Sequence, residues 1–445
     1  MNIIYNIIIG ILFLISKILS PFVPKIKERK KNINNSLKNL TVLNSKAKTI
    51  WFHAASMGEF EQAKPIIEFI KNEISNKTNF KIQIVCSFFS PSGFNSQKNY
   101  KFTDVICYLP NDTYSSAKNF IEKIKPDVAV FIRYELWFNY ISILNKMQIK
   151  TFLINATCPT VLERCKILTP FYKNIFNKFS EIYTVSKEEN QKFHKLKLNT
   201  KTIQSSDTRF DRILQKVEEA KINPVISKDL FFENEIIFVA GSVWNQDVDV
   251  ILEAYKQLLK NTISTNIEKF KLRLIFVPHE PTSQNIQYIE RKIQTTVQQN
   301  TILLSEIATP TARNDGQSIE ISKNDLAEKI IIVDSIGKLL KLYGVADIAY
   351  VGGGFGVGIH SITEPAGYGI PLVVGKNCFN SPDTKELLEQ KALTIIEDSE
   401  MLLDCFMEFH SKEERAKSGF AAQNYIKNNC GSTKIIADRI NLILN

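Results

Sequence analysis

The sequence has few of the features by which several common protein classes are identified. Its seven cysteines are odd in number and scattered, with no Cys-X-X-Cys pair, so we predict a reducing compartment and no structural metal site. Neither the Gly-X-Gly-X-X-Gly fingerprint of dehydrogenases nor the Gly-Lys-Ser/Thr of ATPases is present. No zinc-finger or RNP motif accompanies the formal net charge of +10, so nucleic acid is not expected. The positive charge instead favours acidic lipids or a phosphorylated substrate.

Glycine is also scarce, with 17 residues in 445, yet five of them fall within residues 352–358. This cluster follows an apolar run of strand length, residues 346–351, and precedes Glu364. Glycines at the end of a strand let a phosphate approach backbone N–H groups. The pattern therefore predicts a nucleotide or sugar-phosphate site, with Glu364 as a ligand of ribose hydroxyls. A loop that only turns tightly is the alternative.

The N-terminal residues 1–19 are almost wholly apolar, and five Lys or Arg residues follow within residues 25–31. A helix of that length rises ~1.5 Å per residue and is slightly short of a ~30 Å hydrocarbon core. A signal peptide would need positive charge before the apolar run and a small-residue cleavage site, and neither is present. We predict a membrane anchor over residues 1–24 that holds the chain at the cytoplasmic face of the cell inner membrane. A helix buried in a soluble core is the alternative.

From residue 48 onward, short β-rich runs alternate with amphipathic segments in two series. Such alternation predicts an α/β protein with two doubly wound parallel sheets that face a cleft, where ligands lie at the carboxyl ends of the strands. We expect a first domain over residues 25–212, a linker over residues 213–235, and a second domain over residues 236–445 with closing C-terminal helices. The expected strands are residues 49–53, 82–88, 128–132, 150–154, 182–185 and 201–204 in the first domain, and 236–241, 272–277, 330–333, 347–351 and 371–374 in the second.

Two carboxylates and one cation lie just beyond predicted strands of the first domain. Glu59 and Glu135 each follow a strand, where a carboxylate facing a cleft can accept a proton from an acceptor hydroxyl. A Glu in the first turn of a helix, as predicted for Glu59, also serves simply as a favourable N-terminal charge. Arg209 follows the last strand, where a cation can neutralise charge on a departing phosphate. An ion pair with Asp207 or Asp211 is the alternative for Arg209.

Taken together, these segments resemble the 3-deoxy-D-manno-octulosonic acid (Kdo) transferases of lipopolysaccharide biosynthesis, glycosyltransferase family 30. The similarity covers nearly the whole chain and rests on six motifs in the same order and spacing. They are Trp51–Phe60 (family pattern H-a-a-S-x-G-E), Tyr134–Trp137 (E-L-W), Leu153–Arg164 (I-N-A, then E-R), Ala240–Ser242, Asp334–Leu339 and Tyr343–Pro365. The resemblance implies the GT-B architecture, with an N-terminal acceptor domain and a C-terminal domain that binds CMP-Kdo. It also implies inverting transfer of Kdo to a lipid A precursor (lipid IVA), with no metal or other cofactor.

The resemblance also assigns residues to roles. It matches the family's general base to Glu59, a second acid that stabilises the transition state to Glu135, and a basic residue, usually Lys, to Arg209. Contacts to CMP-Kdo fall on Pro278, His279, Ile336, Gly337, Lys338, Ser361, Ile362, Thr363 and Glu364. Three of these positions depart from the family pattern, since His279 replaces Arg, Lys338 replaces Glu and Ser361 replaces Asn. An imidazole at position 279 predicts a weaker, pH-sensitive phosphate contact.

Two alternatives stay open at this point. One is another GT-B nucleotide-sugar enzyme, such as an epimerase, which would need no apolar N-terminal segment. The other is a non-catalytic, membrane-associated protein that binds a nucleotide sugar, against which the joint presence of Glu59 and Glu135 argues.

Overall fold

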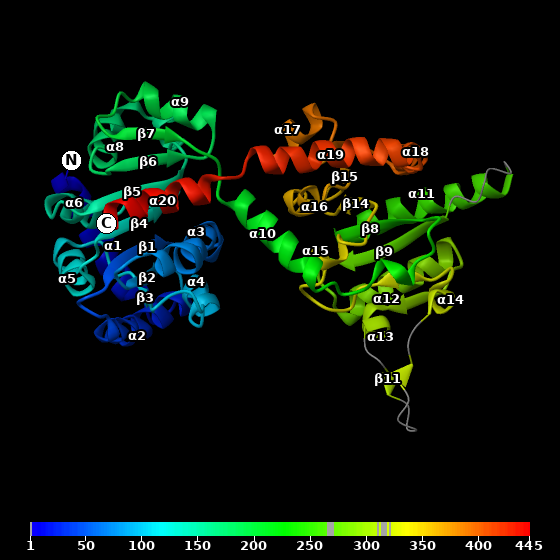
Figure 1. The fold of residues 1–445 in the computed structure, drawn as a ribbon, viewed down its shortest axis with the longest axis horizontal. Coiled ribbons are helices and arrows are strands. Elements are labelled where there is room, and N and C mark those ends of the chain that lie inside the picture. Colours follow the sequence, from blue (N-terminus) through cyan, green and yellow to red (C-terminus); the bar gives the residue numbers. More distant parts are fainter. Residues whose placement is uncertain (1, 265–270, 309–310, 313–317, 320–321) are drawn as a thin grey trace. The chain divides into compact units, whose positions relative to one another are not determined.

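The computed structural model describes residues 2–264, 271–308, 311–312, 318–319 and 322–445 (Figure 1). The described chain divides into two compact units. The first contains the residues up to 212 together with residues 429–445, and the second contains residues 213–428. Each unit is built on its own seven-stranded sheet, which confirms the predicted α/β class with two doubly wound sheets.

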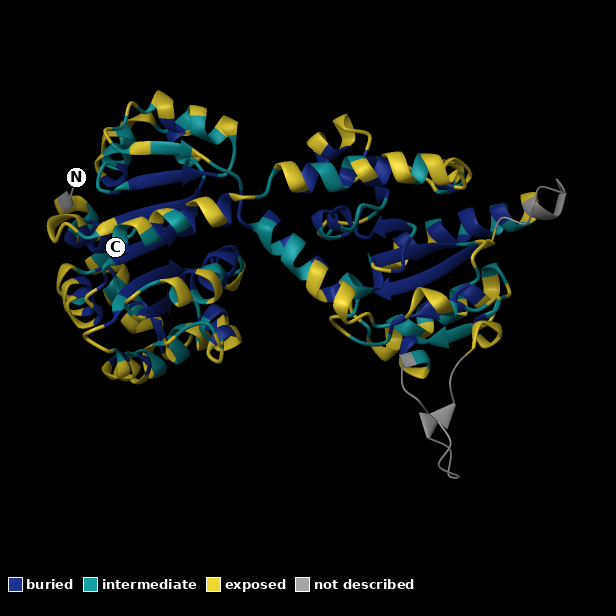
Figure 2. Cartoon of the chain, in the orientation of Figure 1, coloured by how far each residue is buried: buried dark blue, intermediate teal, exposed yellow. Residues whose placement is uncertain are grey.

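The sheet of the first unit is parallel throughout and has the order β3-β2-β1-β4-β5-β6-β7. The chain order reverses between β1 and β4, and in open α/β sheets ligands bind at the carboxyl ends of strands that flank such a reversal. Neighbouring side chains of the central strands are buried on opposite faces, as for Trp51 and Phe52, because helices cover both faces (Figure 2). The strands are β1 (Lys48–Ala54), β2 (Ile82–Phe88), β3 (Val105–Tyr108), β4 (Val128–Ile132), β5 (Lys150–Ala156), β6 (Glu181–Thr184) and β7 (Lys201–Gln204).

The helices of the first unit include two at the N-terminus and one at the C-terminus of the chain. They are α1 (Asn2–Leu19), α2 (Pro24–Lys38), α3 (Met57–Phe69), α4 (Pro91–Gln97), α5 (Tyr114–Ile124), α6 (Phe138–Lys146), α7 (Val161–Arg164), α8 (Thr169–Phe176), α9 (Lys187–Lys195) and α20 (Ser432–Leu444). Helix α10 (Arg209–Ile222) begins in the first unit and continues into the second.

The sheet of the second unit is also parallel and has the order β10-β13-β9-β8-β14-β15-β16. Its chain order reverses between β8 and β14, so the glycine cluster that follows β14 lies at a second position of this kind. The strands are β8 (Glu235–Val243), β9 (Lys271–Pro278), β10 (Thr301–Leu303), β13 (Ile330–Ile332), β14 (Ile348–Val351), β15 (Leu372–Gly375) and β16 (Leu393–Ile396). The helices are α11 (Asn245–Ser264), α12 (Ser283–Thr296), α13 (Leu304–Ala308), α14 (Lys323–Leu326), α15 (Leu339–Leu342), α16 (Thr363–Tyr368), α17 (Thr384–Glu389), α18 (Ser399–Glu408) and α19 (Lys412–Asn428), and a two-stranded pair joins β11 (Thr311–Ala312) to β12 (Ser318–Ile319).

Two segments are placed differently from the domain boundaries expected from the sequence. Helix α20 was expected to close the second domain, but it belongs to the first unit, where it contacts α3 and β4. Ile436, Ala437 and Ile440 are buried there in the core of the first sheet. The expected linker, residues 213–235, is helical as far as Ile222 and belongs to the second unit. An amphipathic pattern predicts that a helix buries one face, but not which sheet receives it.

Helix α1 is attached to the first unit near its N-terminal end. The Tyr5 hydroxyl donates a hydrogen bond to Asp112 at 2.5 Å, and its ring lies against Phe138 and Phe171. Asn139 donates to the Asn6 side chain at 2.9 Å. Most other large apolar side chains of α1 are exposed, which argues against the alternative of a helix buried in a core. They are Ile3, Ile4, Ile7, Ile8, Ile11, Leu12, Leu14, Ile15, Ile18 and Leu19.

In the part of the chain that the structure describes, no helix by itself has the length and apolarity needed to cross a membrane. Helices α1 and α2 meet the length and composition criteria only as a pair, which is bent by 105° at the break between them. Helix α2 lies against β3, where Ser36 accepts a hydrogen bond from the backbone N–H of Tyr108.

Candidate active site

Glu59 and Glu135 lie beyond the carboxyl ends of β1 and β4, the two strands at the reversal of the first sheet. Ser56 caps helix α3, and Glu59 is the third residue of that helix. The two residues form a capping box, in which Ser56 accepts from the N–H of Glu59 and the Glu59 carboxylate accepts from the N–H of Ser56. The local sequence Ser-X-X-Glu therefore explains both the start of α3 and the orientation of the Glu59 side chain.

Only one of the two carboxylate oxygens of Glu59 serves this capping role. Oε2 accepts from the N–H groups of Ala55 at 2.6 Å and of Ser56 at 3.2 Å. Among the described residues, Oε1 has no hydrogen-bond partner. Glu59 thus has a structural role at the start of α3, beyond the favourable N-terminal charge expected as the alternative, and one oxygen remains available to a substrate.

The surroundings of Glu59 favour a carboxyl group that changes its protonation state near neutral pH. The side chain is 7% exposed, and burial, assisted by the nearby charge of Glu135, raises its pKa to about 7. The N–H groups of Ala55 and Ser56 and the Arg133 guanidinium oppose that rise. A pKa close to the working pH suits a general base, because the base is then ionised and still accepts a proton readily.

Glu135 contacts one buried side chain, His53, and one partly buried side chain, Trp137. The Trp137 indole N–H donates to Oε2 of Glu135 at 2.6 Å, and Nε2 of His53 lies 3.4 Å from the same oxygen. The opposite ring nitrogen of His53, Nδ1, lies 2.9 Å from the hydroxyl of Ser87, which also accepts from Trp51. His53 and Trp137 were not among the predicted site residues. His53 lies in the motif that contains Glu59, and Trp137 lies in the motif that contains Glu135. Their place in these motifs was the feature of the sequence that could have identified them.

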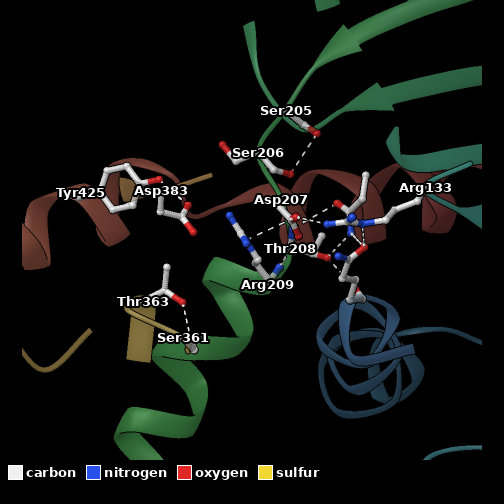
Figure 3. A network of polar contacts seen from close by, with 12 residues as sticks. Arg133, Ser205, Ser206, Asp207, Thr208, Arg209, Ser361, Thr363, Asp383 and Tyr425 are labelled. Atoms are coloured by element: carbon white, nitrogen blue, oxygen red, sulfur yellow. Dashed lines mark hydrogen bonds and ion pairs between the residues drawn. The ribbon is translucent and has the colours of Figure 1, made fainter. Parts of the chain in front are cut away.

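A polar network surrounds Arg209 at the end of the first unit (Figure 3). The Asp207 carboxylate is 4% exposed and accepts from the backbone N–H of Arg209 at 2.9 Å. Its Oδ2 lies 3.5 Å from Nε of Arg209 and 3.4 Å from Nη2 of Arg133. Asp211 instead accepts from the N–H groups of Gly431 and Thr433. Of the two alternative ion-pair partners expected for Arg209, the structure shows Asp207.

Arg133 was not among the site residues predicted from the sequence, although it comes directly after β4. It has a φ of 59°, and Asn155 in β5 has a φ of 50°. Both values are in the left-handed region, which is uncommon for residues with side chains and is less unfavourable for Asn than for Arg. Arg133 and Asn155 both donate to the side chain of Gln62, and Asn155 also donates to Thr208. Arg133 and Asn155 thus bring two polar side chains to the same buried network.

In the second unit, the glycine cluster is explained largely by close backbone packing. A Cβ atom on Gly352 would lie 2.4 Å from the carbonyl oxygen of Ser242, and one on Gly354 would lie 2.5 Å from the backbone nitrogen of Gly375. Gly353 has a φ of 97°, and its N–H donates to the buried carboxylate of Asp247 at 2.9 Å.

The N–H groups of this cluster are largely engaged within the unit. Those of Gly352, Gly356 and Gly358 donate to backbone carbonyls, in addition to the bond from Gly353 to Asp247. The expected role of these four donors as a phosphate cradle therefore does not fit the structure, and the alternative of a tight turn explains them. A sequence shows that glycine is needed, but not whether a ligand or another backbone segment fills the space of the missing side chain.

Three rings are stacked beside this loop, and His279 is the central one. The ring of His279 lies 4.6 Å from that of Trp244 and 4.3 Å from that of His360. Burial and the nearby His279 lower the pKa of His360, while the charge of Asp247 opposes that shift. Next to the stack is a cavity of about 250 Å³ that is lined in part by Trp244, Pro278 and His279. Pro278 and His279, two of the residues predicted to contact the donor, thus line the same cavity.

The remaining predicted donor contacts lie on two loops of the second unit. The hydroxyls of Ser361 and Thr363 are 3.1 Å apart (Figure 3). Glu364 follows in the first turn of α16, where burial raises its pKa and the charge of Lys216 opposes that shift. Ile362 is only 1% exposed, so its side chain is part of the core. Ile336, Gly337 and Lys338 precede α15, with Ile336 85% exposed and Gly337 at a φ of 79°.

No group of three or more His, Cys, Asp or Glu side chains within the described residues is arranged to hold a metal ion.

The fold shows the structural class to which the chain belongs. Two parallel seven-stranded sheets with flanking helices form a GT-B architecture. The chain is similar to the crystal structure of UDP-GlcNAc 2-epimerase from Neisseria meningitidis, with a TM-score of 0.57 over 89% of this chain and all of that one. The identity to that structure is 14%, so the likeness shows the fold alone.

Sequence comparison then gives the family. Residues 25–212 match the family model of 3-deoxy-D-manno-octulosonic-acid transferase. A 3-deoxy-D-manno-octulosonic acid transferase of Aquifex aeolicus is 30% identical over 344 residues, which cover 77% of this chain and 80% of the relative. One of Haemophilus influenzae is 25% identical over 407 residues, which cover 87% of this chain and 86% of the relative. The chain therefore belongs to the Kdo transferase family of glycosyltransferases, and the expected family is confirmed.

Proposed function

We propose that this protein transfers Kdo from CMP-Kdo to a hydroxyl of the lipid A precursor lipid IVA, with inversion at the anomeric carbon, during lipopolysaccharide assembly at the inner membrane. Membership of the Kdo transferase family supports the donor and the reaction class. The observation that carries the mechanism is the Glu59 carboxyl, which has one oxygen without a partner among the described residues and a pKa near 7.

In the proposed reaction, an acceptor hydroxyl attacks the anomeric carbon of Kdo while Oε1 of Glu59 takes the proton of that hydroxyl. The bond between the anomeric carbon and the phosphate oxygen breaks, and CMP leaves with the electron pair. Glu135, which Trp137 and His53 hold in place, stabilises the positive charge that develops on the sugar ring. Arg209 offsets the negative charge that develops on the departing phosphate.

The second unit binds the donor in this proposal. The cavity beside His279 and the hydroxyls of Ser361 and Thr363 supply polar groups for the phosphate, and the carboxylate of Glu364 accepts from the ribose hydroxyls. The proposed step needs no cofactor. Glu59 takes the proton, CMP leaves with the electron pair, and Arg209 offsets the negative charge on the phosphate.

Replacing Glu364 by Ala is expected to weaken the binding of CMP, since a charge-assisted hydrogen bond worth ~1.5–3 kcal/mol is lost. Because burial raises the pKa of Glu364, wild-type affinity should also fall as the pH is lowered and the carboxylate takes up a proton. Calorimetric titration with CMP measures both effects. Glu389→Ala, an exposed Glu on α17, is the matched control and should leave the affinity unchanged. Equal affinities for wild type and Glu364→Ala would exclude Glu364 as a ribose ligand.

Helix α1 supports a peripheral attachment of the protein to the membrane. Changing Ile4, Ile8 and Ile11 together to Asn keeps Tyr5 and Asn6 in place and should release the protein from lipid vesicles. The partition coefficient should fall by roughly 10³-fold or more, because each exposed Ile side chain that no longer enters lipid forfeits ~1.5–3 kcal/mol. Vesicle co-sedimentation measures the effect, with the same three positions changed to Leu as the control. Unaltered sedimentation of the Asn variant would show that α1 is not the attachment.

Product analysis tests the proposed function as a whole. The purified protein is incubated with CMP-Kdo and a tetra-acylated lipid A precursor, and the lipid product and free CMP are quantified by mass spectrometry. We expect CMP and Kdo-lipid in amounts that match. Rearranged nucleotide sugar without transfer would indicate an epimerase, and donor binding without turnover would indicate a binding protein.

A further inference from the structure

A cavity of about 530 Å³ lies in the first unit next to the carboxyl ends of β4 and β5. Its volume is within the ~300–1,000 Å³ that is usual for a ligand site. The walls include side chains of Tyr5, Leu136, Val161, Phe171 and Ile175. No described residue that lines the cavity carries a formal charge. A partly open cavity of this composition favours an apolar ligand, because a charged group placed against its walls would lose hydration without gaining a charged partner.

The position of the cavity relates it to the candidate active site. Tyr134 and Leu136 both line it, and Glu135 lies between them in the chain. Residues 157–161, which follow β5, form another wall. The cavity is therefore built from loops at the same edge of the sheet as the two candidate catalytic acids.

Helix α1 contributes directly to the cavity wall through Tyr5. The Tyr5 ring lies 5.7 Å from that of Phe171, another wall residue, and its hydroxyl is anchored on Asp112. Most other apolar side chains of the same helix are exposed, among them Ile4 at 60% and Ile8 at 49%. Helix α1 thus carries an exposed apolar surface and also contributes Tyr5 to the wall of the uncharged cavity. The contacts of Tyr5 with Phe171 and Asp112 hold the helix at that wall.

We propose that this cavity binds one acyl chain of the lipid acceptor and thereby raises the affinity of the protein for the acylated acceptor. The inference rests on the proposed function, since it requires an acylated acceptor. An acyl chain fits the observations because each methylene group gains free energy on leaving water for an apolar site, whereas the sugar headgroup gains none there. The lining, the volume and the shared helix α1 all favour this occupant over a polar one.

Filling the cavity with a larger side chain tests the proposal. Val161→Trp places an indole in the cavity, and Thr160→Trp does so from an exposed wall position that is less demanding for folding. Ile167→Trp is the matched control, because Ile167 is 80% exposed and does not line the cavity. Each variant is assayed with two acceptors, the tetra-acylated precursor and the same disaccharide after its acyl chains have been removed.

We expect Val161→Trp and Thr160→Trp to raise KM for the acylated acceptor by roughly tenfold, which corresponds to the lost burial of about two methylene groups. KM for the deacylated acceptor and the turnover number should stay at the wild-type values, and Ile167→Trp should change neither KM. Equal changes in KM for both acceptors, or no change for either, would overturn the proposal. Failure of the wild type to transfer Kdo to any acceptor would instead refute the proposed function, so the two failures are distinguishable.

Discussion

Replacing Glu59 by Gln is expected to slow Kdo transfer by ~10²–10⁴-fold, the usual contribution of a positioned general base. Gln keeps the size of the side chain and the oxygen that accepts from Ala55 and Ser56, so α3 should remain capped. It cannot accept the proton of the acceptor hydroxyl. The affinity for CMP should not change, because the predicted donor contacts belong to the second unit. Single-turnover rates and calorimetric titration with CMP on the same variant measure both quantities.

The pH dependence of the rate gives a second readout for Glu59. A base must be ionised, so the wild-type rate should rise with pH through about 7, the pKa to which burial and Glu135 raise Glu59. Replacing Glu135 by Gln removes the neighbouring charge, which should move this rise to lower pH. The direction follows because the charge of Glu135 disfavours ionisation of Glu59.

Thermal unfolding separates catalysis from helix capping at the same position. The pKa of Glu59 is higher in the folded protein than in the unfolded chain, so its contribution to stability is present below about pH 4.5 and is lost as the pH rises through about 7. Gln does not ionise, so Glu59→Gln should match the wild type at pH 5 and exceed its midpoint at pH 8. A role limited to helix charge predicts a loss of ~0.3–1 kcal/mol and near-normal transfer. Transfer at close to the wild-type rate would remove Glu59 from the mechanism.

Replacing Arg209 by Ala is expected to lower the turnover number by ~10²–10³-fold, the typical effect of removing one group that stabilises developing negative charge. The charge on the phosphate grows as the bond to Kdo breaks, so turnover should fall more than donor affinity. Arg209→Lys keeps a positive charge at the same position, so it should retain most of the activity.

The network around Asp207 should remain folded when Arg209 is replaced, so a fall in turnover reports on the reaction rather than on folding. Asp207 also lies 3.4 Å from Arg133, so it keeps one cationic neighbour when Arg209 is removed, and the buried network should stay folded. Arg291→Ala, an exposed position on α12, is a control for the loss of one positive charge. Equal turnover in the Ala and Lys variants would show that the charge at position 209 is not used.

The periodicity of the sequence was sufficient to locate most of the sheet. All eleven expected strands are present, because buried parallel strands are continuous apolar runs bounded by polar turns. Five further strands, β3, β10, β11, β12 and β16, were missed. Three of them, β3, β10 and β16, lie at an edge of a seven-stranded sheet, and β11 and β12 form a separate two-stranded pair.

The candidate site was predicted in outline but not in its contacts. Residues close to strand ends, such as Glu59 and Glu135, are visible in a sequence because the strand pattern itself marks the edge of the sheet. Their neighbours are not visible, because His53 contacts Glu135 from 82 positions away and Arg133 shares Asp207 with Arg209 from 74 positions away. Such contacts depend on which strands pair, and pairing between distant segments has no local signature.

The family, the two α/β units and the acids at the ends of β1 and β4 could be predicted from the amino-acid sequence, because motifs and periodicity are local properties of the chain. The folded structure was needed to show that α20 returns to the first sheet, that the glycines at 352–354 pack closely within the second unit, and that burial raises the pKa of Glu59. Each of these depends on what fills the space around a residue. The groups that surround a residue come from distant parts of the chain, and the sequence alone does not show which distant segments pack together.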